Sequence, residues 1–526
     1  MAMGFLSLLA GACSTAQHKG KVDEQVYAIL RHAEKEVFNR ETNFSIDTTR
    51  SGASLDEINN AALYNKSNQK GSVSLSIKDS IDFAIKNSPT YQNAKENLYL
   101  TALNMSDVNI PFRINPSSDA DVSRSRESDG DQRLDAGVTN SLSTLLKGGG
   151  SISLSLANDL LKFFTGSSDR SISSIINFNI SQPLLRGAGA SIAAESLTQS
   201  HRNVIYQIRT YAVFQQDFSR DIVIDYLRLL QLKEQINNEE TNLKSRTQNF
   251  EYLKARAIDR SSPEEVADAE QDVLEARTRF INAKSNFSTQ LDSFKIQIGM
   301  PAGMTLQLKQ SELDRLVKVG PVPFSLSEKA SYKAALENRA QLLNDIDEFE
   351  DSRRDVLIAA DDLRTTLNFV SNSSISSSGE RWERLNFNDL STSVGIELDL
   401  PINKKRERND YRRVLINFDS DARALRQEHD LLKNLVNLRF RQLKQFRQNY
   451  DIEVGSVKLA KRRVEGNKLR LKAGTVIFRR LSESQDALIS AQNAVTAALV
   501  NYQESRLTLY TDLGILNVEK PQFWLE

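Results

Sequence analysis

The sequence predicts a mixed α/β protein in which one unit occurs twice, each copy combining a long helical hairpin with strands. The first observation is an internal repeat, since the segment that ends at Gly299 recurs about 215 residues later in the segment that ends at Gly514. The second is a low content of helix breakers, 10 Pro and 22 Gly in 526 residues, which favours long uninterrupted helices. The third is strict alternation of apolar and polar residues in short segments of both copies. Equivalent positions keep one offset: Val266 and Leu481, Val273 and Leu488, Ala276 and Ala491, Ala283 and Ala498, Asn286 and Asn501.

The repeat divides the chain into segments with different expected roles. We expect a signal or lipoprotein segment at 1–13, a polar tether at 14–74, the first repeat at 75–300, a linker at 301–323, the second repeat at 324–516 and a tail at 517–526. Lys plus Arg equals Asp plus Glu at 68 each, so no global field attracts nucleic acid. No window reaches the roughly 18 consecutive apolar residues of a membrane-spanning helix. A membrane passage would therefore have to use strands closed into a barrel.

The only cysteine, Cys13, follows a short apolar run that begins at Gly4. A single thiol excludes an internal disulfide framework. Its position after small and apolar residues resembles a lipoprotein signal cut before Cys13, and Ser14 after it resembles outer-membrane sorting. The run before Cys13 contains no Lys or Arg, which a start codon placed too far downstream would explain. An ordinary cleaved signal or an inert thiol is the alternative.

Each copy begins with a helix that leads into strands. The first helix runs from Ser76 to about Met105 with a break expected at Pro89, and its equivalent runs from Ser327 to about Ala360. The strand-like segments are Ser151–Leu156, Ile176–Ser181 and Val394–Leu400. The first copy has an additional strand-like hairpin, Leu134–Leu142 and Ser151–Asn158, around Gly148-Gly149-Gly150. The alternation fits a soluble sandwich as well as a transmembrane strand.

Long helices follow the strands. Ile222, Leu229, Ile236, Leu243 and Phe250 stand seven residues apart, which predicts supercoiled packing against neighbours. Helices of 65 to 75 residues would extend roughly 100 Å at about 1.5 Å per residue. The chain then reverses into return helices about half as long. Capping by Ser262, Pro263 and Glu265 marks the first reversal, and Gly474 marks the second.

These elements, in this order and twice over, resemble the TolC-like outer-membrane efflux protein family from about Leu75 to Leu516. The most specific matches are Leu75–Ile81 with Asn87-Ser88-Pro89, Ser181–Gly187 and Leu471–Thr475. The resemblance implies a homotrimer whose strands share one transmembrane β-barrel in the Gram-negative outer membrane, continued by an α-helical barrel across the periplasm. It also implies a passive conduit that receives substrates from an inner-membrane pump and a periplasmic adaptor protein, with no cofactor. Twelve strands per trimer is the family expectation, and the additional hairpin would raise this number to eighteen.

Candidate site residues lie at the tips of the hairpins and in one strand. Glu265, Asp268, Arg480 and Glu483 match the family's acidic constriction, except that Arg480 replaces an acidic residue. Arg479 and Arg480 suggest closure by salt bridges with neighbouring carboxylates or a weaker attraction for cations, whereas solvated tip charges are the simpler interpretation. Phe478 is a weaker gate candidate, because such aromatic residues usually pack between helices.

In the strand, Glu397 and Asp399 would line the lumen of a barrel. The run Lys404–Arg408 just below this strand reads as a solvated helix start or as an interfacial basic cluster.

An enzyme is not expected. The four histidines, His18, His32, His201 and His429, are scattered without metal-ligand spacing, and no nucleophile motif or phosphate-binding glycine loop is present. The competing class is a soluble periplasmic coiled-coil scaffold with the strands in a sandwich domain. Within the channel class, a conduit for secreted proteins competes with one for small toxic compounds or metals.

Overall fold

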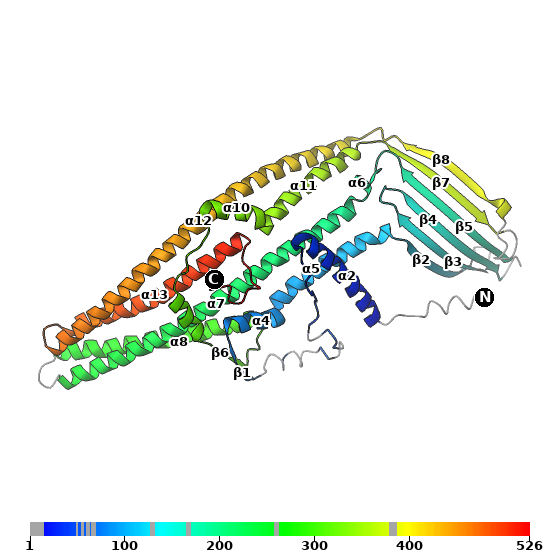
Figure 1. Ribbon diagram of the computed structural model, residues 1–526. Coiled ribbons are helices and arrows are strands. Elements are labelled where there is room, and N and C mark those ends of the chain that lie inside the picture. The colour runs from blue at the N-terminus through cyan, green and yellow to red at the C-terminus, as the bar shows by residue number, and fades with distance from the viewer. Residues whose placement is uncertain are drawn as a thin grey trace. The chain divides into compact units, whose positions relative to one another are not determined.

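The computed structural model describes residues 15–48, 51–53, 57–58, 64, 70–126, 132–164, 170–256, 262–377 and 387–525. The chain forms two compact units, and each unit takes segments from both sequence copies (Figure 1). One unit comprises Met1–Phe44, Leu98–Ile208 and Asn344–Gln427. The other comprises Ser45–Asn97, Arg209–Leu343 and Glu428–Glu526.

The helices follow the predicted order. They are α2 (Thr15–Phe38), α4 (Ile77–Asn87), α5 (Pro89–Asn109), α6 (Ala190–Ala193), α7 (Glu195–Arg256), α8 (Pro263–Gln297), α9 (Ser311–Val319), α10 (Glu328–Asn338), α11 (Ala340–Asp361), α12 (Lys405–Lys472) and α13 (Phe478–Asp512). The outgoing helices α7 and α12 have 62 and 68 residues, and the return helices α8 and α13 have 35 each, which confirms the predicted half-length hairpins. Within the described parts of the chain, no helix combines the length and apolar character that a membrane crossing requires.

The break expected at Pro89 separates α4 from α5. Helix α4 starts with a complete capping box. The Ser76 hydroxyl accepts a hydrogen bond from the Asp79 N–H (3.2 Å), and the Asp79 carboxylate accepts one from the Ser76 N–H (2.9 Å). The hydrogen bonds that the Asp79 carboxylate accepts from the Ser76 N–H and from the Ser76 hydroxyl (2.7 Å), helped by Lys309, lower the pKa of Asp79 to about 2.

The strands form two sheets. They are β1 (Gly71–Leu75), β2 (Asn115–Arg126), β3 (Gln132–Leu145), β4 (Ser151–Phe163), β5 (Arg170–Pro183), β6 (Met304–Leu308), β7 (Thr366–Ser376) and β8 (Ser391–Asp399). A two-stranded parallel sheet pairs β1 with β6. The second sheet has six antiparallel strands in the order β2-β3-β4-β5-β7-β8, so β2 and β8 are its two edges (Figure 1).

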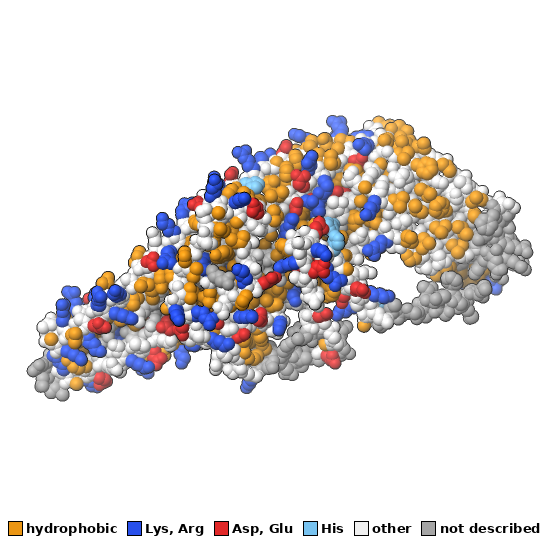
Figure 2. Space-filling model, viewed as in Figure 1, with side chains coloured by type: hydrophobic (Ala, Val, Ile, Leu, Met, Phe, Trp, Pro, Cys, Tyr) orange, Lys and Arg blue, Asp and Glu red, His pale blue; other side chains and the backbone are white. Residues whose placement is uncertain are grey.

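The six-stranded sheet has one apolar and one polar face, because cross-strand partners point to the same side. The register places these residues on the apolar face: Val138, Leu142, Ile152, Leu154, Leu156, Ile176, Phe178, Ile180, Phe369, Val394, Ile396 and Leu398. Several of them are strongly exposed, up to 68% for Ile396. Apolar side chains dominate the visible surface of the strands, whereas Lys, Arg, Asp and Glu cover the helices (Figure 2).

In the second unit, the two sequence copies form the same close contact. Gly299 and Gly514 end α8 and α13 with φ of 75° and 70°, a left-handed conformation that glycine adopts at little cost. A Cβ at Gly299 would collide with the Asn87 carbonyl oxygen, and one at Gly514 would collide with the Asn338 carbonyl oxygen. Because Asn87 and Asn338 end the equivalent helices α4 and α10, this contact joins the first and last helices of each repeat.

Candidate functional site

The tips of the two helical hairpins lie in the second unit and share a small apolar cluster. Leu253, Ala269, Leu471, Phe478 and Leu481 are buried there, with Phe478 only 2% exposed. Gly474 ends α12, where its N–H donates to the Leu471 carbonyl (3.0 Å), as the glycine stop predicts. The Phe478 side chain therefore packs between the helices of its own chain, which favours the packing interpretation over a gate.

Glu265 connects the two hairpins. Ser262 caps α8 as expected, and its hydroxyl accepts from the Glu265 N–H (3.2 Å). The Glu265 carboxylate does not complete a capping box but accepts from the backbone N–H of Phe478, the first residue of α13 (3.5 Å). Since the N-cap residue of α13, Ile477, supplies no side-chain bond, Glu265 places its charge at the positive end of that helix.

The other predicted tip charges are exposed. Asp268, Arg479, Arg480 and Glu483 all point toward solvent. Among the described residues, neither Arg479 nor Arg480 pairs with a carboxylate, and the Arg480 carbonyl accepts from the Asn467 amide (3.0 Å). Residues 257–261 of the first reversal lie outside the described residues. Among the described residues of one chain, no carboxylate thus forms the salt bridge to Arg479 or Arg480 that the suggested closure of the tip requires.

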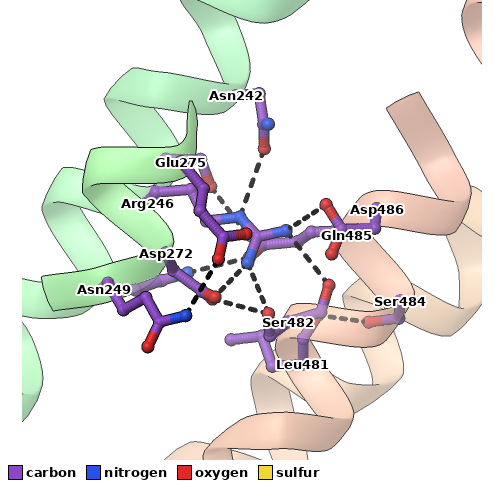
Figure 3. Close-up of polar contacts among 12 residues, drawn as sticks. Asn242, Arg246, Asn249, Asp272, Glu275, Leu481, Ser482, Ser484, Gln485 and Asp486 are labelled. Carbon is purple, nitrogen blue, oxygen red and sulfur yellow. Dashed lines mark hydrogen bonds and ion pairs between the residues drawn. The ribbon is translucent and has the colours of Figure 1, made fainter. Parts of the chain in front are cut away.

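A buried arginine that the sequence analysis missed joins three helices behind the tip (Figure 3). Arg246 of α7 is 1% exposed and pairs with Asp272 of α8 and with Asp486 of α13 (2.8 Å). Its guanidinium also donates to the hydroxyl and carbonyl of Ser482 and to the Asn242 side chain (3.3 Å). The planar guanidinium can satisfy several acceptors at once, which a lysine could not do in this geometry.

The buried seam of α7 changes character along the helix. Ile222 and Leu229 are buried as the heptad predicts, but Ile236, Leu243 and Phe250 are only half-buried. Over the same stretch the buried positions are polar: Glu239, Asn242 and Arg246 are each less than 5% exposed. Arg246 stands three residues after Leu243, at a position where the heptad pattern expects an apolar residue. This charged residue within the apolar repeat was the signal that the sequence offered.

In the first unit, Glu397 and Asp399 lie on the polar face of the six-stranded sheet. Glu397 pairs with Asn368, and Asp399 pairs with Thr366. The same face contains Asp119, Asp121, Thr139, Ser141, Ser153, Ser155, Asn177, Asn179, Asn372 and Ser374. The two carboxylates therefore belong to a continuous polar surface that spans the sheet. Cys13 lies outside the described residues.

No protein-family model matches the chain, and no curated protein matches it in sequence. Solved structures match it in fold. The outer membrane protein VceC from Vibrio cholerae superposes with a TM-score of 0.62 at 12% identity, over 83% of this chain and 96% of VceC. The Campylobacter jejuni CmeC outer membrane channel gives 0.58 at 14%, over 90% of this chain and 93% of CmeC.

The open state of the Neisseria gonorrhoeae MtrE outer membrane channel also matches, with a TM-score of 0.59 at 13% identity over 84% of this chain and 89% of MtrE. Because all three identities are below 15%, the likeness concerns the fold. The order of helices and strands predicted the same fold. The chain is thus a structural match to the TolC-like outer-membrane channels.

Proposed function

We propose that this protein is the outer-membrane exit duct of a tripartite efflux or secretion system and conducts substrates passively. The observation that carries the proposal is the six-stranded sheet, whose apolar face is exposed and whose two edges are open. An exposed apolar face of this size is unfavourable in water and suited to lipid. A soluble scaffold would need a second layer over that face, and no second sheet packs on it within the described residues.

Open edges support assembly from several copies. Six strands are fewer than the eight of the smallest known membrane barrels, so β2 of one copy would pair with β8 of the next. The fold likeness supports a homotrimer. Strand β3 pairs with β4 from Arg133–Phe163 to Leu145–Ser151, which makes the additional hairpin a full part of the sheet. We therefore favour eighteen strands per trimer over twelve.

The tip of the helical hairpins is the proposed constriction, and an adaptor protein and an inner-membrane pump are the proposed partners there. Asp268, Arg479, Arg480 and Glu483 are exposed, so symmetry-related copies could bring them together around an axis. Glu265 and Phe478 would support this constriction by fixing the start of α13. Glu397 and Asp399 would make the lumen near the outer mouth acidic.

Two parts of the proposal lie outside the hairpins. A lipid anchor at Cys13 would hold the protein at the outer membrane, and mass spectrometry of the N-terminal peptide tests it. The cargo, a small compound, a metal ion or a protein, would be chosen by the pump.

Conductance of the purified protein in planar bilayers tests the function. We expect discrete channel steps whose cation preference changes at least about twofold in Glu483→Gln and in Arg480→Ala, in opposite directions, because rings of charge set ion selectivity. Lys329→Gln, an exposed charge on α10, is the matched control and should leave the preference unchanged. Absence of any channel steps would reject the duct. Channel steps whose cation preference is the same in both tip variants as in the parent protein would support the duct but would show that the constriction is not at the tip.

A further inference from the structure

Two histidines that lie far apart in the sequence meet in the first unit. His32 and Glu36 are four residues apart on α2 and therefore share one face of that helix. His201 comes from the first turns of α7. The ligand atoms of the three side chains all lie within 4.8 Å of one another. The expectation that the histidines are scattered holds for the sequence but not for these two in space.

Helix α2 is held in a defined register, so the cluster follows from the fold. Its apolar stripe of Val26, Leu30 and Ala33 is almost fully buried. The Tyr99 hydroxyl of α5 donates to Asp23 (2.7 Å), and the Tyr27 and Tyr99 rings pack edge to face at 5.9 Å. These contacts fix the rotation of α2 and present His32 and Glu36 toward His201.

The distances suit a transition-metal ion. Bonds of about 2.0–2.1 Å at a tetrahedral angle separate two ligand atoms by roughly 3.4 Å. His201 Nε2 and Glu36 Oε2 are already 3.3 Å apart. The exposed His32 side chain would need only a small rotation to complete the set. A hollow of about 350 Å³, lined by both histidines and by Met105 and Asn109, leaves room for water as a further ligand.

We propose that His32, Glu36 and His201 form a binding site for a divalent transition-metal ion, with Zn²⁺ or Cu²⁺ favoured by two imidazoles and one carboxylate. The ion would fasten α2 to α7 and so hold the N-terminal helix on the body of its unit. An ion pair between His201 and Glu36 alone would contribute little at such exposed positions and gives no role to His32. The site is independent of the proposed channel function.

Titration of the full-length protein in detergent tests the site. The tested protein has the Cys13→Ser substitution and an affinity tag that contains no histidine. Neither a thiol nor the tag can therefore contribute metal ligands. Zn²⁺ is titrated by calorimetry, and Cu²⁺ is followed by electron paramagnetic resonance. His18→Ala is the matched control, because His18 is an exposed histidine on the same helix outside the cluster.

We expect the parent protein to bind one ion per chain. His32→Ala and His201→Ala should bind it with an affinity at least about tenfold lower, because losing even an outer-shell partner of a metal ligand lowers the affinity by this factor or more. The Cu²⁺ spectrum should show coupling to two nitrogens in the parent protein and in His18→Ala, and to one nitrogen in His32→Ala and in His201→Ala. Zn²⁺ should also slow trypsin cleavage within 15–38 at least about tenfold in the parent protein and have no effect in His201→Ala. Equal affinity in parent and His201→Ala proteins, or an equal loss in His18→Ala, would overturn the site.

Discussion

Removing the Arg246 side chain should loosen the attachment of α13 to the first hairpin. The guanidinium is 1% exposed and contacts Asp272, Asp486, Ser482 and Asn242 on three helices. Breaking a buried ion pair costs about 3–5 kcal/mol, because the remaining partner loses its counter-charge. Here the side chains of Asp272 and Asp486 are 21% and 53% exposed, so water would replace part of the lost interaction.

We therefore expect Arg246→Ala to cost about 2–4 kcal/mol in the local stability of the tip. At about 1.4 kcal/mol per factor of ten, hydrogen exchange of the α13 amides near Ser482 should become roughly 30 to 700 times faster. Hydrogen-exchange mass spectrometry of the detergent-solubilised protein measures this rate. Because the N-terminal part of α4 does not contact Arg246, its amides serve as an internal reference.

Arg228→Ala is the matched control. Arg228 of α7 also pairs with a carboxylate of α13, that of Glu504 (2.7 Å), but its side chain is 52% exposed. An exposed pair contributes about 0–1 kcal/mol, so the exchange should change by less than about fivefold. If Arg246→Ala leaves the exchange of α13 unaltered, or if Arg228→Ala matches it, the buried arginine does not hold the hairpins together.

Three further predictions test the repeat, the helix start and the sheet. Gly299→Ala should lower the midpoint of thermal unfolding more than Gly320→Ala. Both glycines have positive φ, a conformation that costs other residues about 1–2 kcal/mol, but only at Gly299 would the added Cβ also collide with backbone atoms. Equal shifts of the midpoint would contradict the close contact. Since the pKa of Asp79 is lowered to about 2, the carboxylate stabilises α4 above pH 4, and this stabilisation is lost as the pH falls toward 2. The hydrogen-exchange rate of α4 should therefore rise over this pH range in the parent protein beyond any rise in Asp79→Asn. If the sheet forms part of the proposed membrane barrel, Ile396→Lys on the apolar face should destabilise membrane assembly by up to about 2–4 kcal/mol, the cost at the bilayer midplane, whereas Ser393→Lys on the polar face should not; membrane fractionation measures the difference.

The helical part of the fold was predictable because its signals are local. A proline opens α8, a glycine closes α12, and a low content of breakers allows the long helices between. The repeat also identified Gly299 and Gly514 as equivalent, and their shared contact with the ends of α4 and α10 confirms that equivalence.

Other elements could not be predicted because their signal is not in the local pattern. Strand β2 carries Asp119, Asp121 and Arg124 and lacks a clear apolar alternation, as expected for an edge strand. The pairing of β1 with β6 depends on a contact between segments far apart in the sequence. At the tip, the positions of exposed charges were predictable from the hairpin turns. Arg246 was missed although it stands three residues after Leu243, where the heptad pattern expects an apolar residue, because a single arginine on a long helix normally lies in solvent.

The polar stretch of α7 has a consequence for any movement of the tip. Separating an apolar interface in water costs free energy in proportion to the apolar surface that becomes exposed. An interface of Glu239, Asn242 and Arg246 exposes groups that water can solvate instead, so its separation would expose little new apolar surface along this stretch of α7. This stretch of α7 is thus suited to repeated separation, whereas the apolar packing around Ile222 and Leu229 and the apolar cluster at the tip are suited to staying closed.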